Sequence, residues 1–279
     1  MGNGVNEGNK KLRVITVANQ KGGVGKTTTS VALGGIASAL GYRVLLVDID
    51  PHGSLSTYFR QDPDAQELSS YTLFQERKEL SAASVKRLIR ATDYPNLDLL
   101  PSATALATLE RQAIGQDGMG LVIARSLAFI YDDYDFVFID TPPLLGVLMI
   151  NALAACQHLV IPVQTEFLAL KGLERMVNTL KMMSRSRKKA LEYTILPLMF
   201  DRRTQASVTS LRTIRNTHGD EVWPGHIPVD TKFRDASRVG IPPHLFDETA
   251  RGVDAYKSLF KYLMQKFSME DARLAAGGL

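Results

Sequence analysis

The chain has 279 residues, of which 45% are hydrophobic and 22% are charged, and its formal net charge is +4. This length and apolar content suffice for one large domain with a buried core. The single cysteine, Cys156, excludes an internal disulfide and a metal site built on several cysteines. No run of about 20 apolar residues occurs, which argues against a transmembrane helix. The small basic excess permits contact with nucleic acid without requiring it.

The first ten residues are rich in Gly and Asn and are predicted to form a flexible N-terminal tail, residues 1–10. They lack the apolar segment of a secretory signal. Position 6 is Asn6 rather than Ser or Thr, so the Met-Gly start does not predict myristoylation. We therefore expect an intracellular, cytoplasmic protein.

Residues 12–29, with the sequence LRVITVANQKGGVGKTTT, predict a strand, a glycine-rich turn and the start of a helix that ends near Leu40. In such a turn, backbone N–H groups and the positive end of the helix dipole bind phosphate. Lys26 is placed to reach the β- and γ-phosphates, and the Thr27 hydroxyl to hold Mg²⁺. The predicted ATP-binding residues are Lys21, Gly22, Gly23, Val24, Gly25, Lys26, Thr27 and Thr28.

This loop differs in one place from the general phosphate-loop pattern, G-x-x-x-x-G-K-[ST]. Gln20 stands where the pattern has its first glycine, and Lys21 follows it as a second lysine. The resulting pattern is K-G-G-x-G-K-[ST].

The strand predicted at residues 43–47 (RVLLV) leads directly into Asp48, Asp50 and Pro51. Ligands bind at the carboxyl ends of strands in open α/β sheets, so these carboxylates belong to a candidate site. Asp50 is predicted to be catalytic and to bind Mg²⁺, the alternative being an aspartate that caps the loop before Pro51. Asp48 is as consistent with a site carboxylate as with one that binds water or caps the loop.

The central part of the chain has weaker patterns. Residues 54–75 do not predict a defined structure. Helices are predicted at residues 82–90, 103–114 and 120–131, with a short strand at 97–100.

A second carboxylate follows another continuous apolar strand. Residues 136–139 (FVFI) are followed by Asp140, and this arrangement is typical of the aspartate near Mg²⁺ in phosphate-loop ATPases. The alternative is an aspartate that closes a turn at the strand end. Three strand ends thus supply a phosphate cradle, a metal ligand and a carboxylate to orient water, which phosphoryl transfer to water requires.

The remaining pattern continues the alternation of strands and helices, which predicts parallel β-α units. We predict an α/β fold with one domain: a mostly parallel twisted sheet flanked by helices, spanning residues 11–267, with a frayed C-terminal tail at 268–279. The remaining predicted helices are 147–156, 167–183, 205–217 and 247–267, the strands are 11–18, 158–162 and 194–198, and 223–230 is strand or turn.

Five stretches resemble the ParA branch of the ParA/MinD/Soj superfamily of deviant Walker A ATPases, over roughly residues 11–266. They are ANQKGGVGKTTT, RVLLVDIDPHGS, FVFIDTPP, NALAACQHLVIPVQTEFLALKGL and IPVDTKFRDASRVGIPP. The resemblance implies a homodimer that sandwiches two ATP molecules with Mg²⁺. It further implies that Lys21 reaches the partner's phosphates and is catalytic with Lys26. Gly22 would then lie where the subunits approach closely, and Asp50 would orient the attacking water.

The resemblance also implies adenine contacts from residues 200–203 and 227–230. The chain departs from the family at two positions. The family usually has Gln where this chain has His52, to which we assign no role. It often has Arg-Asn where this chain has Val229 and Asp230, which leaves one nucleoid-contact position without its basic residue.

Basic residues accumulate in the second half of the chain. Family members hold double-stranded DNA non-specifically through such a surface, and contacts to phosphates carry no sequence information. The alternative is a scatter of solvated charges. Residues 184–189 (SRSRKK) form a basic link, and the candidate DNA-binding residues are Arg202, Arg203, Arg212, Arg215, Lys232 and Arg234.

The resemblance predicts an ATPase whose hydrolysis switches a dimer to a monomer and releases DNA or an activating protein partner. The cargo that the resemblance implies is a chromosome or plasmid partition complex, or a chemotaxis array at the cell pole. The segments DPHGS, SRSRKK and MFDRR resemble the ParC subgroup, which positions chemotaxis arrays, and therefore favour the chemotaxis array at the cell pole as the cargo. The protein would then lie at the pole or on the nucleoid. The alternative is a small-molecule synthetase or ligase that uses the same phosphate loop.

Two related classes are not expected. A MinD-like membrane switch needs a basic amphipathic helix at its end, whereas the end of this chain, FSMEDARLAAGGL, has two acids and little apolar face. An iron–sulfur ATPase of the nitrogenase-reductase kind needs cluster cysteines, which Cys156 alone cannot supply.

Overall fold

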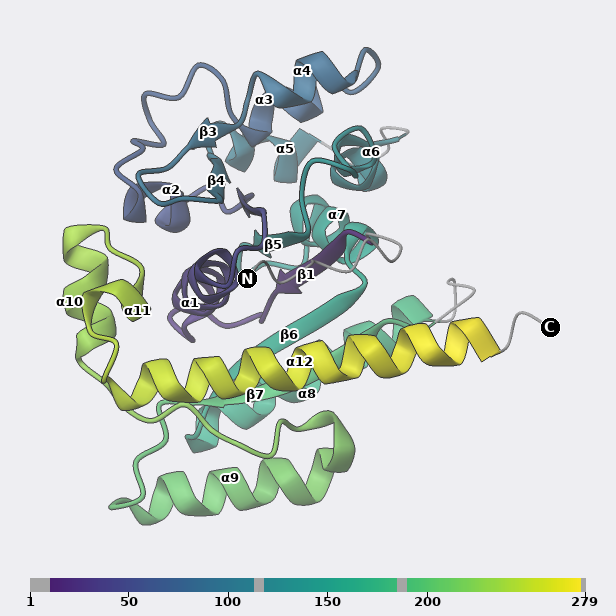
Figure 1. Ribbon diagram of the computed structural model, residues 1–279. Coiled ribbons are helices and arrows are strands. Elements are labelled where there is room, and N and C mark those ends of the chain that lie inside the picture. Colours follow the sequence, from purple (N-terminus) through teal and green to yellow (C-terminus); the bar gives the residue numbers. More distant parts are fainter. Residues whose placement is uncertain (1–10, 113–117, 185–189, 277–279) are drawn as a thin grey trace.

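The computed structural model describes residues 11–112, 118–184 and 190–276, and its centre is a seven-stranded sheet (Figure 1). The strand order is β3-β4-β2-β5-β1-β6-β7. Neighbouring strands run parallel except at the edge, where β3 is antiparallel to β4. The strands are β1 (Arg13–Val17), β2 (Val44–Asp48), β3 (Arg90–Ala91), β4 (Leu97–Leu100), β5 (Phe136–Asp140), β6 (His158–Gln164) and β7 (Glu192–Leu198).

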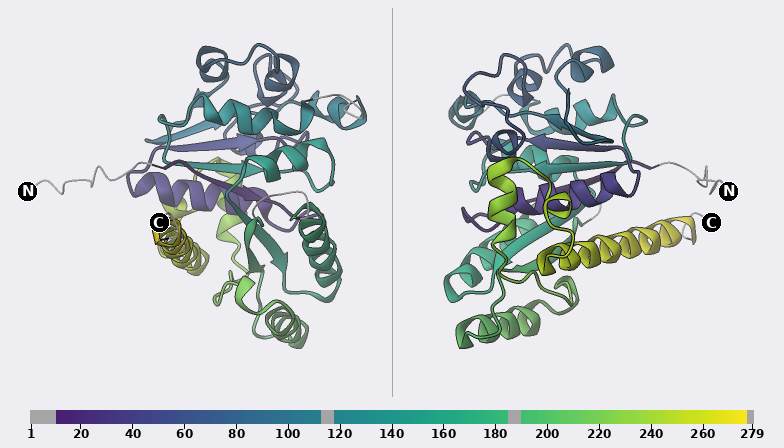
Figure 2. Two further views of the ribbon diagram at one scale, coloured as in Figure 1. Left: turned by 90° about the vertical axis from the view of Figure 1, so that its right-hand side faces the viewer. Right: turned by 60° about the vertical axis from the view of Figure 1, so that its left-hand side comes forward.

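Helices cover both faces of this sheet (Figure 2). The helices are α1 (Lys26–Ala39), α2 (Ser54–Tyr58), α3 (Ser70–Gln75), α4 (Ala82–Lys86), α5 (Leu106–Gln112), α6 (Val122–Ala128), α7 (Val147–Ala155), α8 (Phe167–Ser184), α9 (Gln205–His218), α10 (Lys232–Val239), α11 (Pro243–Phe246) and α12 (Arg251–Ala276), with 3₁₀ turns η1 (Met119–Leu121) and η2 (Gly219–Glu221). None of the helices in the described ranges is long and apolar enough to cross a membrane.

Two hydrophobic cores lie on opposite faces of the sheet. Successive side chains of a strand point to opposite faces. Accordingly, Val137 and Ile139 of β5 pack in the core beneath α6, α7 and α8, whereas Phe136 and Phe138 pack against α1 and α12. Because both faces are covered, the central strands are apolar at nearly every position, which is the pattern that predicted them.

The topology brings three polar strand ends together. Strand β5 lies between β1 and β2, so Asp140 pairs in register with Val17 on one side and with Asp48 on the other. The loop that follows β1 and the residues that follow β2 and β5 therefore share the carboxyl edge of the sheet. This edge is where open α/β sheets bind their ligands.

The predicted fold class is confirmed, and several boundaries differ. The helix predicted at 82–90 ends at Lys86 because Arg90–Ala91 pairs with β4. Residues 54–75, which showed no pattern, contain the short helices α2 and α3. Residues 223–230, predicted as strand or turn, form no regular strand. Single β-bridges pair Val222 with Ile195 and Pro228 with Phe200.

The C-terminal helix differs most from its prediction. Residues near 247 belong to the end of α11, and α12 begins at Arg251. The tail predicted at 268–279 is helical as far as Ala276. Asp271 in this extension forms ion pairs with Lys11 and Arg13, which attach the helix to the first strand. The predictions for residues 1–10 and for most of the basic link at 184–189 lie outside the described residues.

Candidate nucleotide-binding site

The phosphate loop connects β1 to α1 at the carboxyl edge of the sheet. Gly23 and Gly25 have φ angles of 70° and 85°, in the left-handed region that favours glycine. A Cβ atom on Gly25 would also lie 2.9 Å from Leu198 Cδ1. The backbone therefore needs glycine at these positions to turn from the strand into the helix.

Lys26 is the first residue of α1 and is buried, with 7% of its surface exposed. Its Nζ atom donates a hydrogen bond to the backbone oxygen of Lys21 at 3.5 Å. Within the described residues it forms no ion pair. No described carboxylate lies within ion-pair distance of Nζ, although the charge of Lys26 partly offsets the rise in the pKa of Asp140 that burial causes. A phosphate would give this buried lysine a direct counter-ion.

Asp140 lies beside the start of α1, with its carboxylate in an incompletely satisfied environment. Thr27 Oγ1 donates to Asp140 Oδ2 at 2.6 Å. The other oxygen, Oδ1, is buried and has no hydrogen-bond partner among the described residues. Burial raises the pKa of Asp140, and the neighbouring Asp48 raises it further. A bound cation, or water on that cation, would satisfy the free oxygen and favour the charged form.

The donor set fits Mg²⁺. Thr27 and Asp140 offer a hydroxyl and a carboxylate, the hard oxygen ligands that Mg²⁺ prefers. In the ranges that the structure describes, no three His, Cys, Asp or Glu side chains gather into a metal site. That is expected for Mg²⁺, which takes one or two protein ligands and completes its shell with phosphates and water.

Asp48, whose role the sequence left open, holds the loop that follows β2. Its carboxylate accepts hydrogen bonds from the backbone N–H of Asp50 at 3.1 Å and from the N–H and hydroxyl of Ser56, both at 2.7 Å. Ser70 donates to the Asp48 backbone oxygen, and Ser102 to that of Asp50. Burial raises the pKa of Asp48. These serines were not predicted, because they are far apart in the sequence and only the fold brings them together.

Asp50 extends from this loop and lines a cavity of about 640 Å³ together with the phosphate loop. One carboxylate oxygen, Oδ1, accepts hydrogen bonds from the backbone N–H of His52 at 3.0 Å and from its ring Nδ1 at 2.9 Å. His52 lines the same cavity, as do Lys26 and Thr27. The structure thus brings Asp50 and the phosphate loop together as predicted, and adds His52, which sequence reasoning left without a role.

A second cavity of about 340 Å³ adjoins the first, since Gly25, Thr28, Met199 and Ser237 line both. Residues 227–230 line the second cavity, where the resemblance places adenine contacts. Residues 200–203 do not line it, although the resemblance implied adenine contacts there as well.

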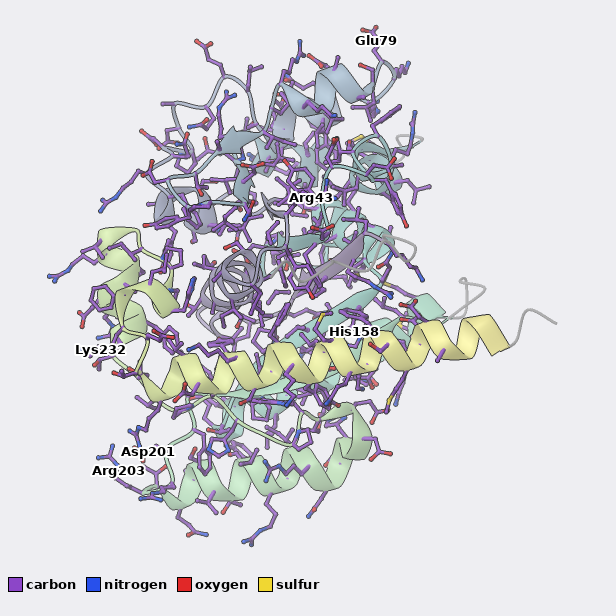
Figure 3. All side chains as sticks on the ribbon, viewed as in Figure 1. Arg43, Glu79, His158, Asp201, Arg203 and Lys232 are labelled. Atoms are coloured by element: carbon purple, nitrogen blue, oxygen red, sulfur yellow. The ribbon has the colours of Figure 1, made fainter. Side chains whose placement is uncertain are left out.

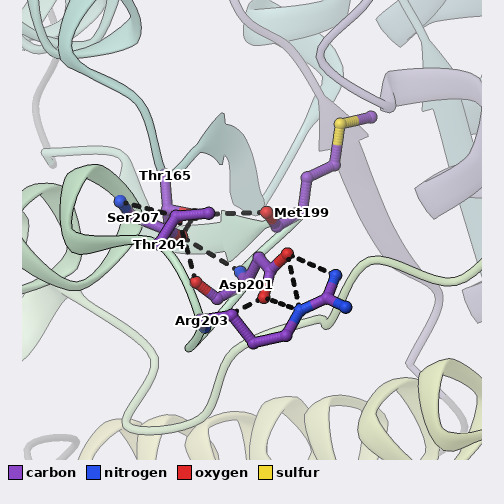
Figure 4. Close-up of polar contacts among 6 residues, drawn as sticks. All are labelled: Thr165, Met199, Asp201, Arg203, Thr204 and Ser207. Atoms are coloured by element: carbon purple, nitrogen blue, oxygen red, sulfur yellow. Dashed lines mark hydrogen bonds and ion pairs between the residues drawn. The ribbon is translucent and has the colours of Figure 1, made fainter.

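The loop at 200–203 is held elsewhere (Figure 4). The Ser207 hydroxyl accepts from the backbone N–H of Asp201 at 3.0 Å and bonds to Thr165 Oγ1 at 2.6 Å. The side chain of Asp201 is occupied by Arg203, and this contact lowers the pKa of Asp201 to about 2. Only Met199, at the start of this loop, reaches the cavity.

Helix α10 was not predicted, yet it supplies Phe233, Arg234 and Ser237 to the wall of the second cavity. Its apolar face is short: Ala236 is buried, and Phe233, three residues earlier, is partly buried against the core. The available signal was Gly240, which follows the helix with a φ of 77° and is typical of a helix C-terminus.

Lys21 does not extend into the phosphate cavity of its own chain. Its Nζ atom forms an ion pair with Glu166 and donates to Gln164 Oε1 at 3.3 Å. Gln164 in turn donates to the backbone oxygen of Gly23 at 3.0 Å. The second lysine of the loop is thus held at the end of β6 and the start of α8.

The six candidate DNA-binding residues differ in how their charges are compensated. Arg203 pairs with Asp201 at 2.7 Å, and Lys232 pairs with Asp247 at 3.4 Å. Figure 3 shows Lys232 and the Asp201–Arg203 pair on the same side of the molecule. The other four are exposed and form no ion pair with any described residue: Arg202, Arg212, Arg215 and Arg234.

Comparisons with known proteins cover almost the whole chain. The model of a family described as AAA domain matches residues 12–193. The sporulation initiation inhibitor protein Soj of Bacillus subtilis is 36% identical over 250 residues, which cover 89% of this chain and 97% of that protein. The chromosome partitioning protein ParA of Caulobacter vibrioides is 34% identical over 268 residues, covering 95% and 98%.

The fold is also found among solved structures. Cobyrinic acid a,c-diamide synthase from Mycobacterium smegmatis with bound ADP and magnesium superposes with a TM-score of 0.78 and is 30% identical. The match covers 92% of this chain and 96% of that one.

Proposed function

Because the chain belongs to the ParA/MinD/Soj superfamily of deviant Walker A ATPases, we propose that it is an Mg²⁺-dependent ATPase whose ATP-bound homodimer positions a cargo in a bacterial cell. One observation carries this proposal. Lys26 without an ion pair, Asp140 with an unsatisfied oxygen and Asp50 meet at one sheet edge, beside two adjoining cavities. Each of the first two groups lacks what Mg-ATP would supply.

The residues divide the chemistry among them. Lys26 and the N–H groups of the loop hold the phosphates, and Thr27 and Asp140 hold Mg²⁺ directly or through water. The metal, when bound, neutralises charge on the phosphate oxygens. Asp50, which lines the same cavity, would orient the attacking water and could help to hold Mg²⁺ through a water molecule. Residues 227–230 receive the adenine in the second cavity.

Lys21 and Gly22 form the dimer contact in this proposal. A Cβ on Gly22 would meet no atom of the described chain within 4 Å, and its φ is not in the left-handed region. The single chain therefore imposes no need for glycine at this position, which supports a close approach by a second subunit. Lys21 would leave Glu166 and reach the partner's phosphates. Hydrolysis removes the γ-phosphate that this lysine contacts, and the dimer separates.

We propose DNA partition as the broad role and polar positioning as a specific alternative. The similarity to the chromosome partitioning protein ParA supports the first. The segments DPHGS and MFDRR, which resemble the ParC subgroup, favour a chemotaxis array as cargo. A fluorescent fusion in cells separates them: DNA partition gives a nucleoid-wide distribution, and array positioning gives foci at the poles.

A synthetase is the second candidate function, because the cobyrinic acid a,c-diamide synthase structure has the same fold at 30% identity. A synthetase would turn over ATP only with its small-molecule substrate. An ATPase of the partition type hydrolyses ATP alone, and DNA or a protein partner stimulates it. Measuring phosphate release with ATP and Mg²⁺ alone therefore tests this alternative.

The central experiment is Asp50→Ala, followed by size-exclusion chromatography with Mg-ATP. We expect a stable ATP-bound dimer and a loss of hydrolysis of about a hundredfold, since the water is no longer oriented. Lys26→Ala is the control that should stay monomeric because it binds no ATP. An Asp50→Ala protein that stays monomeric, or that hydrolyses ATP at the original rate, would contradict the proposal.

A further inference from the structure

The side chains of His52 and Asp50 contact each other beside the cavity at the phosphate loop. His52 Nδ1 lies 2.9 Å from Asp50 Oδ1, and both residues line the cavity with Lys26 and Thr27. A carboxylate only accepts hydrogen bonds, so the ring nitrogen is the donor. The second carboxylate oxygen, Oδ2, accepts no hydrogen bond from the described residues and is not fully buried. It is the oxygen left for a water molecule.

The ring is not needed to hold the loop. Its side chain is 78% exposed, so it contributes little to the core. The loop is fixed instead by Asp48, which accepts three hydrogen bonds from Asp50 and Ser56. The backbone N–H of His52 also bonds Asp50 and remains in any variant. What the imidazole adds is a second donor on one oxygen, which restricts rotation of the Asp50 carboxylate.

We propose that His52 is a positioning residue for ATP hydrolysis, and that its Nδ1–H orients the Asp50 carboxylate so that Oδ2 faces the attacking water. This inference rests on the proposed role of Asp50. A freely rotating carboxylate would present either oxygen in many directions, and misplaced groups reduce the rate of a reaction strongly. His52 therefore acts on the rate of hydrolysis and not on the affinity for ATP.

The test compares two replacements of His52 in the full chain. His52→Asn keeps an N–H donor close to the place of Nδ1, whereas His52→Leu keeps side-chain bulk and removes the donor. Steady-state phosphate release with Mg-ATP gives kcat and KM, and size-exclusion chromatography gives the dimer fraction. For His52→Leu we expect kcat to fall about tenfold, the range of one hydrogen bond to a charged group, with KM and dimer fraction unchanged. For His52→Asn we expect most of the rate to return.

A third variant separates this inference from the function on which it rests. If His52 acts through Asp50, the double variant Asp50→Ala/His52→Leu hydrolyses ATP no more slowly than Asp50→Ala alone. A further loss in the double variant would overturn the inference, as would a His52→Leu enzyme at the original rate or a His52→Asn enzyme as slow as His52→Leu. Asp50→Ala at full rate would instead overturn the proposed function. A slow Asp50→Ala beside an unaffected His52→Leu would overturn only the role of His52.

Discussion

Charged residues are compensated differently at the two ends of the strands in the central sheet. We call the side where the parallel strands begin the amino edge, and the side where they end the carboxyl edge. At the amino edge, Arg43 donates to Asp135 from its backbone N–H at 2.8 Å and from its guanidinium at 3.0 Å. There, too, the Tyr134 hydroxyl donates to Asp98 at 2.8 Å. At the carboxyl edge, Asp140 keeps a buried oxygen without a donor, and Lys26 has no carboxylate partner among the described residues.

Both edges have a cavity, so shape alone does not distinguish them. The cavity at the amino edge measures about 530 Å³ and is lined by Arg43, Asp98 and Tyr134. Its charges are already compensated within the chain, which stabilises the fold. At the carboxyl edge the charges are left incomplete, and such groups are typical of sites that bind a charged ligand. Unsatisfied charge, more than the presence of a cavity, therefore distinguishes the candidate site.

We expect the largest effect from replacing Lys26, the buried lysine at the carboxyl edge. Lys26→Ala should weaken ATP binding more than a hundredfold, because the phosphates lose a buried counter-ion. Titration with a fluorescent ATP analogue measures this. Arg43→Ala, at the other edge, is the matched control and should bind ATP normally. Micromolar binding by Lys26→Ala would contradict the assignment.

A second pair of variants should differ in stability, because only one of them should destabilise the protein. Asp135→Asn removes the negative charge that pairs with Arg43 and replaces one of its two acceptor oxygens by a donor, so it should lower the free energy of unfolding by about 1–3 kcal/mol. Asp140→Asn replaces a buried carboxyl group whose raised pKa shows that its charged form is costly without a cation, so the ligand-free protein should be as stable or more stable. Urea unfolding measures both. Mg-ATP should stabilise the Asp135→Asn protein but not the Asp140→Asn protein; the same response in both would remove the distinction between the edges.

The amino edge should also be sensitive to acid. His158, at the start of β6, is buried and bonds Thr194 at 2.9 Å, and burial lowers its pKa from 6.5 to about 3. Between these values the unfolded chain binds more protons, so stability falls as the pH drops below about 6.5. The loss should reach about 2 kcal/mol near pH 5. His158→Gln should lack this part of the pH dependence in urea unfolding; an identical pH profile would exclude His158 as its source.

We expect the smallest effect at the predicted DNA-binding residues, where an arginine without an ion pair can be compared with one that forms an ion pair. Arg202 is exposed without an ion pair, whereas its neighbour Arg203 is held by Asp201. If the ATP-bound dimer binds DNA, Arg202→Ala should weaken binding a few-fold at low salt and reduce its salt dependence. Arg203→Ala should have less effect. Equal affinities for the wild type and both variants in a filter-binding assay would leave these arginines as solvated charges.

The phosphate end of the site could be predicted from sequence because its residues are contiguous. The strand, the glycine turn, Lys26 and Thr27 occur within one short segment, and Asp50 and Asp140 each follow a recognisable buried strand. The spacing of apolar residues and the positions of glycine and proline are enough to predict such local features.

The second cavity, which adjoins the phosphate loop, could not be predicted in the same way. Its wall combines Met199, residues 227–230 and Phe233 with Tyr256 from α12, and no local pattern joins these segments. Likewise, the role of Asp48 depends on partners such as Ser56 and Ser102, which only the folded chain places nearby. The helical extension to Ala276 is stabilised by a tertiary contact, Asp271 with Arg13, which propensity does not reveal.

The long C-terminal helix also offers a place to attach probes. Near its start, helix α12 contributes Tyr256 to the second cavity, and near its end Asp271 pairs with Arg13 at the start of β1. The end of α12 extends away from α10 and α11 (Figure 1). Cys156, the single thiol of the chain, is buried. A thiol introduced at the exposed Ser268 would therefore react selectively with a fluorescent label. Energy transfer between two such labels would follow subunit association in real time without altering any residue of the site.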